Sequence, residues 1–102
     1  MELRQLEYFQ AVARTGSISA AARELRVSQP SLSMTISRLE DDLGVQLFDR
    51  TGSRIVLNDT GRDLLQNADQ ALTALKEMRS KAADRTGGAT PQISFGVSTA
   101  GY

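Results

Sequence analysis

Serine recurs between residues 17 and 37 of this 102-residue chain, in a stretch that also contains Gln29. A serine hydroxyl becomes a nucleophile only beside a general base, and the chain has neither histidine nor cysteine. These two residue types are also the commonest zinc ligands. No catalytic residue, metal site, disulfide or cofactor is therefore predicted. The chemistry left to these side chains is hydrogen bonding.

Gln29 and three residues near it are of types that recognise base edges in the major groove of DNA. The amide of Gln29 can donate to N7 of adenine and accept from its N6 amino group. Ser33 can donate or accept, and Pro30 and Met34 offer apolar contact to a thymine methyl group. A row of ordinary solvated helix positions is the alternative interpretation.

Other residues are of types that contact phosphates. Arg50 and Arg54 flank a Gly-containing turn and could meet phosphates or the minor groove. The N–H groups around Ser17 and Ile18 open a predicted helix, where an anion is favoured. The complete predicted DNA-binding set is Ser17, Ile18, Ser28, Gln29, Pro30, Ser31, Ser33, Met34, Ser37, Arg50, Ser53 and Arg54.

Helix signals predict the elements that hold these residues. Residues 3–14 carry an apolar stripe that begins at Leu3, and Gly16 ends this helix. Ser17 is an N-cap candidate for a short helix over residues 18–25.

The next helix, residues 29–43, has Ser28 as its candidate N-cap and proline in its first turn. Leu32, Ile36 and Leu39 share its buried face, so Pro30, Met34, Ser37 and Asp41 should point outward. Strands over 45–50 and 54–57 then form a hairpin. Three helices followed by a hairpin are typical of a winged helix-turn-helix.

A long helix is predicted for residues 59–85, with Asn58 as its N-cap. Its apolar residues alternate four- and three-residue steps, which is the heptad pattern of a coiled coil. A second copy of the chain is the simplest partner for this stripe, and packing against its own domain is the alternative. The predicted dimerisation residues are Leu64, Leu65, Ala68, Ala71, Leu72, Leu75, Met78 and Ala82.

Charge and hydropathy restrict the class of protein. Twelve Lys and Arg balance twelve Asp and Glu, so the basic excess of a typical nucleic-acid binder is missing. The acidic run Glu40-Asp41-Asp42 is predicted to be a solvated helix end. No apolar run approaches the ~20 residues of a membrane span, and the N-terminus lacks a signal-peptide pattern. A soluble, cytoplasmic protein without membrane partners is expected.

Residues 17–61 read SISAAARELRVSQPSLSMTISRLEDDLGVQLFDRTGSRIVLNDTG. This segment resembles the N-terminal signature of LysR-type transcriptional regulators, as does LRQLEYFQAVARTGS at residues 3–17. The resemblance covers residues 1–85, and ISFGVS at residues 93–98 is similar to the first strand of the family's effector-binding domain. Co-occurrence of SQP, LFDR and a long following helix makes the resemblance specific.

The resemblance implies a transcription factor that is mainly α, with a winged helix-turn-helix (three helices and a two-stranded wing) and a long dimerising linker helix. It implies a cytoplasmic regulator whose homodimer binds double-stranded DNA at an interrupted inverted repeat. A tetramer is implied for the full-length protein, and a small-molecule effector for its C-terminal domain. By position, Gln29, Pro30 and Ser33 match the recognition helix, and Arg50 and Arg54 match the wing.

Three residues depart from the family's pattern. Met34, Ser37 and Ser53 stand where the family is commonly basic. An altered preferred half-site and weaker binding by the isolated fragment are therefore expected.

The sequence thus predicts three segments: a DNA-binding winged helix-turn-helix over 1–58, a linker and dimerisation helix over 59–85, and a hinge with the first strand of a truncated effector-binding domain over 86–102. The alternative function is a protein-interaction module, which the balanced charge favours. An enzyme has no support in the sequence.

Overall fold

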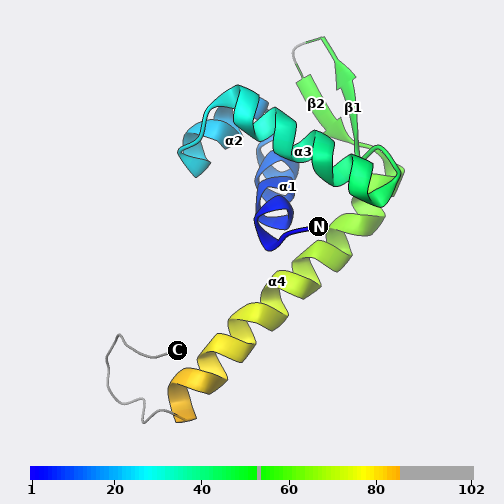
Figure 1. Cartoon of the computed structure of the whole chain (residues 1–102). Coiled ribbons are helices and arrows are strands. Elements are labelled where there is room, and N and C mark those ends of the chain that lie inside the picture. Colours follow the sequence, from blue (N-terminus) through cyan, green and yellow to red (C-terminus); the bar gives the residue numbers. More distant parts are fainter. Residues whose placement is uncertain (53, 86–102) are drawn as a thin grey trace. The chain divides into compact units, whose positions relative to one another are not determined.

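The computed structural model describes residues 1–52 and 54–85. They form α1 (Leu3–Thr15), α2 (Ile18–Leu25), α3 (Gln29–Leu43), β1 (Phe48–Thr51), β2 (Arg54–Leu57) and α4 (Asp59–Arg85), as Figure 1 shows. This order confirms the predicted winged helix-turn-helix and the helix that follows it. Met1–Leu72 form one compact unit, and the part of α4 from Thr73 onward belongs to a second. The predicted hinge and strand over 86–102 lie outside the described residues, as does Ser53.

Serine caps begin the two helices of the helix-turn-helix. The Ser17 hydroxyl accepts a hydrogen bond from the backbone N–H of Ala20 (3.1 Å), and the Ser28 hydroxyl accepts one from Ser31 (3.2 Å). Each bond satisfies an N–H group that has no partner within its helix. Both predicted caps are confirmed, which fixes the first residues of α2 and α3.

The turn between α2 and α3 is unusually tight. Arg26 adopts a left-handed conformation (φ 61°), the one positive φ outside glycine in the described chain. Its N–H donates to the carbonyl of Arg23, and Val27 donates to Ala22 (3.0 Å). These bonds close α2 within one residue, so that Ser28 can begin α3 at once.

The core lies where α1, α2, α3 and the hairpin meet. Leu32, Ile36 and Leu39 of α3 are fully buried, as the sequence predicted. The rings of Phe9 and Phe48 meet edge to face at 5.6 Å, so β1 is held against α1. Leu3 is 42% exposed, contrary to the predicted stripe of α1.

The face of α1 that enters the core is set by its neighbours. Its buried residues are Gln5, Phe9, Ala11 and Val12. The rest of the predicted stripe is confirmed, since Phe9 is buried and Leu6 and Ala13 pack against the core. The buried face is wider than the stripe because α1 contacts two other helices and a strand.

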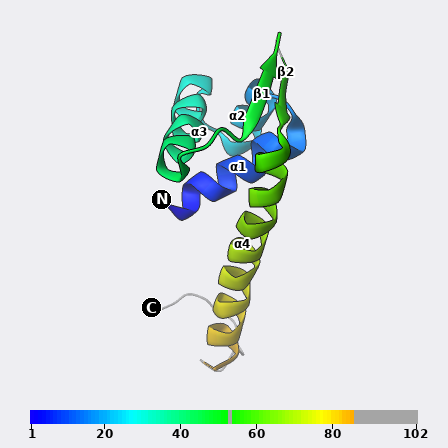
Figure 2. The same ribbon diagram turned by 90° about the vertical axis from the view of Figure 1, so that its right-hand side faces the viewer.

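The wing is a two-stranded antiparallel sheet, visible beside α3 in Figure 1 and edge-on in Figure 2. Its register pairs Phe48 with Leu57 and Thr51 with Arg54. The first strand begins at Phe48, not at Val45 as predicted. The reason lies at Leu47, whose N–H binds the Glu40 carboxylate and so does not bind Asn58, the residue opposite it in the register. Its carbonyl still accepts from the N–H of Asn58.

Asn58 begins α4 and ties it to the wing domain. Its side-chain oxygen accepts from the N–H of Gly61 (2.7 Å), and its side-chain amide donates to the carbonyl of Gln46 (3.0 Å). The predicted cap is confirmed. Because the same side chain also holds the loop before β1, the start of α4 is fixed to the winged domain.

Candidate nucleic-acid interface

The outward face of α3 is the centre of the candidate interface. Pro30, Met34, Ser37 and Asp41 are all exposed, as predicted from the buried stripe on the opposite side. Met34 is 56% exposed. Since α3 is held by three fully buried side chains, this row has one orientation with respect to the domain.

The N-terminal turn of α3 adds polar groups beside that row. Gln29 and Ser31 are exposed and Ser33 is half-buried. Ser28 is exposed, but its hydroxyl oxygen already accepts the capping bond from Ser31. The amide of Gln29 is the largest polar group at this end of the helix, and it can both donate and accept.

Ser17 and Ile18 lie at the start of α2, and both are half-buried. The Ser17 hydroxyl caps the helix and also lies 3.1 Å from the hydroxyl of Ser19. These interactions position the N-terminal turn of α2. Its remaining N–H groups carry the partial positive charge of a helix start.

Arg50 and Arg54 lie on opposite faces of the wing. Arg50 is paired with buried Ile55, so its side chain extends from the same face of the wing, the one that packs on the core. Arg54 is paired with Thr51 on the solvent face. Both are exposed, and neither makes an ion pair within the described residues. Because the two cations extend from opposite faces of the wing, they can contact different phosphates.

A different arginine is already neutralised. Arg14 and Glu24 form an exposed ion pair that joins α1 to α2, with one hydrogen bond of 3.0 Å. The hydrogen bond from Arg14 lowers the pKa of the Glu24 carboxyl, and the same bond raises the pKa of Arg14. Arg14 is therefore not one of the cations free to bind phosphate.

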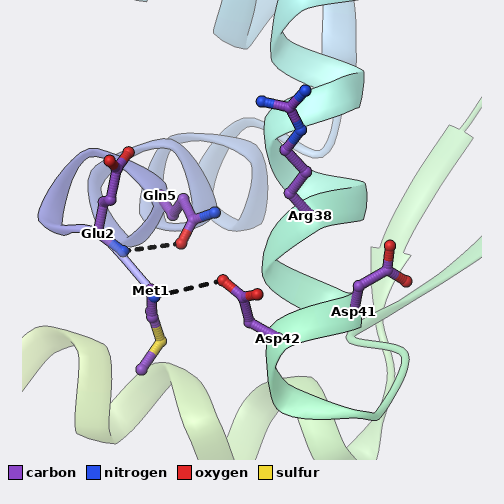
Figure 3. Close-up of a pocket in the computed structure, with 6 residues that line it drawn as sticks. All are labelled: Met1, Glu2, Gln5, Arg38, Asp41 and Asp42. Atoms are coloured by element: carbon purple, nitrogen blue, oxygen red, sulfur yellow. Dashed lines mark hydrogen bonds and ion pairs between the residues drawn. The ribbon is translucent and has the colours of Figure 1, made fainter.

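Arg38 extends from α3 on the side of α1, next to the outward row. Figure 3 shows it together with Gln5 and Asp41 among the residues that line a shallow depression of about 400 Å³. The other lining residues are Met1, Glu2 and Asp42. The three carboxylates of this depression outnumber its two cations, Arg38 and the Met1 ammonium that pairs with Asp42, so negative charge predominates and disfavours a phosphate.

The acidic run at the end of α3 was only partly predicted. Asp41 and Asp42 are exposed, but Glu40 is half-buried and accepts a hydrogen bond from the backbone N–H of Leu47 (2.8 Å). The prediction of a solvated helix end is wrong for Glu40. Its carboxylate fixes the loop that leads into the wing, and so positions the wing relative to α3.

Two further positioning contacts were missed by the sequence reasoning. A Cβ added at Gly61 would lie 2.1 Å from the carbonyl oxygen of Leu47, so only glycine fits there. The signal was an isolated glycine within a helical pattern, which often marks a close approach of backbones. The side-chain amide of Gln10 donates to the Asp69 carboxylate (2.6 Å) and connects α1 to α4. No local sequence pattern predicts this hydrogen bond.

Comparison with known proteins identifies this arrangement. The profile of the bacterial regulatory helix-turn-helix proteins of the lysR family matches residues 3–62, which is more than half of the chain. The chain belongs to the LysR family. Each element from α1 to the first turn of α4 lies inside the matched region.

Individual LysR-type relatives agree with this assignment. The regulator ClcR of Pseudomonas putida is 48% identical over 87 residues, which cover 83% of this chain and 30% of ClcR. The chain therefore spans about a third of the length of this curated relative. No described helix is both long and apolar enough to cross a membrane.

Solved structures of LysR-type regulators have the same fold. The DNA-binding domain of BenM, solved with benA site 1 DNA, is 37% identical with a TM-score of 0.79; the match covers 82% of this chain and 98% of that one. The DNA-binding domain of CbnR, also solved with DNA, is 42% identical with a TM-score of 0.73, over 87% and 98% of the two chains.

The predicted dimerisation residues of this LysR-family chain fall into two groups. Ala68 and Leu72 are buried within the described chain, and Leu64 and Leu65 pack against its core cluster. The alternative that α4 packs on its own domain therefore holds for this first group. The second group remains available on α4: Ala71 and Ala82 are exposed, Leu75 is half-buried and Met78 is 63% exposed.

Proposed function

We propose that this chain is the DNA-binding part of a LysR-type transcriptional regulator, which binds an interrupted inverted repeat in double-stranded DNA as a homodimer. In this proposal α3 enters the major groove with Gln29 and Ser33 at base edges. Arg50 and Arg54 of the wing contact the sugar-phosphate backbone. The backbone N–H groups at Ser17 and Ile18, where α2 begins, bind a phosphate. Ser28, Ser31 and Ser37 lie along the same helix within reach of the groove. Ser53 is proposed as a wing contact from its sequence position alone.

One observation carries this proposal. The outward face of α3 has exposed hydrogen-bonding and apolar groups on a helix whose rotation is fixed by fully buried Leu32, Ile36 and Leu39. Such a rigid, exposed helix face is what reading a groove requires. Support comes from the DNA-bound BenM and CbnR domains, which share the fold at identities of 37% and 42%.

The test is a binding titration with labelled duplexes at several salt concentrations. A duplex enriched by this chain from a random pool is compared with a scrambled duplex of the same base composition. We expect tighter binding to the enriched duplex, with log affinity falling linearly as log salt rises, because neutralised phosphates release counterions. Equal affinity for the two duplexes would contradict sequence-specific binding.

A protein-interaction module is the second candidate, favoured by the balance of twelve basic and twelve acidic residues. In that case the outward face of α3 would dock on a partner protein. Apolar docking responds weakly to salt, so a chain that shows no salt-dependent duplex binding, while α4 still self-associates, would favour this candidate.

The remaining features of the proposal concern the whole protein. We propose a cytoplasmic regulator without catalytic activity, since the homologues are named as transcriptional regulators. Assembly into a tetramer and binding of a small-molecule effector are proposed for the full-length protein through its C-terminal domain, and no cofactor is proposed for the chain itself. Sedimentation of the full-length protein would test the tetramer.

A further inference from the structure

Two apolar side chains lie together on the outward face of α3. Pro30 is exposed and Met34 is 56% exposed, and they are four residues apart on the helix. Side chains at that spacing are neighbours, about 5–6 Å apart at Cβ. They form a small apolar patch in the middle of a face that is otherwise polar.

The patch cannot turn into the protein. Leu32, Ile36 and Leu39 are fully buried on the opposite side of α3, so a rotation that hid Met34 would expose them. The methionine is therefore held in water in the free protein, where exposed apolar surface is unfavourable.

The patch itself contains no charged residue, and the nearest cation along α3 is Arg38, one turn after Met34. The outward row consists of Pro30, Met34, Ser37 and Asp41. The one arginine of α3, Arg38, lies in the depression beside Gln5 on the α1 side. Positions 30 and 34 themselves therefore lack the bidentate donor with which an arginine reads guanine, and offer an apolar surface instead.

The major groove contains one apolar feature, the C5-methyl group of a pyrimidine. Resting on the proposed function, we propose that Met34, with Pro30 beside it, recognises a pyrimidine C5-methyl group in each half-site. Methionine suits this role because its unbranched, polarisable side chain adapts to an irregular surface. Thymine and 5-methylcytosine both carry this group.

The test begins with the duplex enriched by the whole chain from a random pool of unmodified DNA. Each thymine is replaced in turn by deoxyuridine, which removes the methyl group and keeps every hydrogen-bonding group. We expect one thymine in each half-site at which the replacement weakens binding about three- to fivefold, as loss of one buried methyl group predicts.

Variants tie this loss to Met34. In Met34→Ala the thymine and deoxyuridine duplexes should bind equally at that position, and Met34→Leu should restore the preference for thymine. Val45→Ala serves as the matched control, because Val45 is also an exposed apolar residue (39%) but lies outside the proposed contact set. It should retain the full deoxyuridine effect.

A second duplex distinguishes the two sources of the methyl group. Cytosine and 5-methylcytosine, each paired with guanine, are placed at the position of the sensitive thymine. Tighter binding to 5-methylcytosine would assign recognition to the methyl group in either base, whereas equal binding would assign it to thymine alone.

Two results separate this inference from the proposed function. If no duplex is enriched from the pool, the proposed function itself fails. If a duplex is enriched but no thymine is sensitive to deoxyuridine, or the sensitivity persists in Met34→Ala, methyl recognition by Met34 is wrong while DNA binding stands.

Discussion

Within the proposed interface, Gln29 is the residue on which we expect base recognition to depend most. Its side chain is exposed at the first position of α3, directly after the Ser28 cap. The cap uses the Ser28 hydroxyl to satisfy a backbone N–H, so the neighbouring glutamine amide is not needed for the helix start. It remains available to both polar groups of an adenine edge.

Replacing Gln29 by alanine should therefore reduce specific binding far more than general binding. We expect Gln29→Ala to lose about 1–3 kcal/mol toward the enriched duplex, the value of a bidentate base contact. Affinity for random DNA, which depends on phosphate contacts, should change little. Fluorescence anisotropy at one fixed salt concentration measures both. Gln66→Ala, an exposed glutamine of α4, is the control; equal losses on both duplexes would argue against base reading by Gln29.

Glu40 is not among the proposed DNA contacts, but it connects α3 to the wing. Its carboxylate accepts the N–H of Leu47, a fully buried residue, and so connects the end of α3 to the wing. A donor left without its acceptor in a partly buried place is costly, typically about 1–3 kcal/mol.

Glu40→Ala should accordingly lower the free energy of unfolding by about 1–3 kcal/mol, measured by urea denaturation. Glu40→Gln keeps an acceptor oxygen at the same reach and should lose much less. Asp41→Ala, an exposed residue of the same acidic run, should be close to neutral. Similar stabilities for the alanine and glutamine variants of Glu40 would show that the hydrogen bond to Leu47 is not what this residue supplies.

Among the elements, the junction between the wing and α4 is the most constrained. Asn58 caps α4 while its own N–H donates to the Leu47 carbonyl at 3.0 Å. That carbonyl lies against the first turn of α4 at Gly61, where a Cβ would approach it to 2.1 Å. The helix can approach the wing this closely only because the residue at that point has no side chain.

This close approach reverses the usual effect of alanine in a helix. Gly→Ala commonly stabilises a helix interior by up to about 1 kcal/mol. Gly61→Ala should instead destabilise the winged domain by about 1–3 kcal/mol or more, since the Leu47 backbone must move. Thermal denaturation, with exposed Thr60→Ala in the same turn as control, tests this. An unchanged or raised melting temperature for Gly61→Ala would mean that the junction is looser than described.

The helix bounds could be predicted because their signals are local. Ser17 and Ser28 precede the helices that they cap, and a glycine in the left-handed conformation ends α1 and α3. The exposed row of α3 followed from periodicity in the same way. These features depend on residues within a few positions of one another, which a sequence displays directly.

Features set by distant contacts could not be predicted. The strand begins at Phe48 because the Glu40 carboxylate takes the backbone N–H of Leu47, which then does not pair with Asn58. Leu3 is exposed although it continues an apolar stripe. The opposite faces of Arg50 and Arg54 depend on the hairpin register. Each of these features depends on which segments are in contact in the folded chain, and periodicity alone does not predict those contacts.

For the whole molecule, the division of the α4 stripe decides what holds two copies together. Leu72 is 8% exposed within the first compact unit, whereas Met78, in the second, is 63% exposed. A change at Leu72 therefore tests the fold of one chain, and a change at Met78 tests what the chain binds. The heptad pattern alone did not distinguish these roles.

Met78→Glu should dissociate the proposed homodimer and leave the winged domain folded. A carboxylate introduced into an apolar coiled-coil seam must be desolvated without a partner, so we expect self-association to weaken roughly tenfold or more. Sedimentation over a range of concentrations measures this, and circular dichroism checks the fold. Ser80→Glu adds the same charge two residues away, at an exposed heptad position outside the seam, and should remain associated.

The same pair of variants connects assembly to DNA binding. If α4 joins two copies, Met78→Glu should lose affinity for a duplex with two half-sites while keeping its affinity for a single half-site, because only the first gains from linked binding. Ser80→Glu should keep both affinities. Dissociation of both variants to the same extent, or of neither, would place the interface elsewhere than on the stripe that contains Leu75 and Met78.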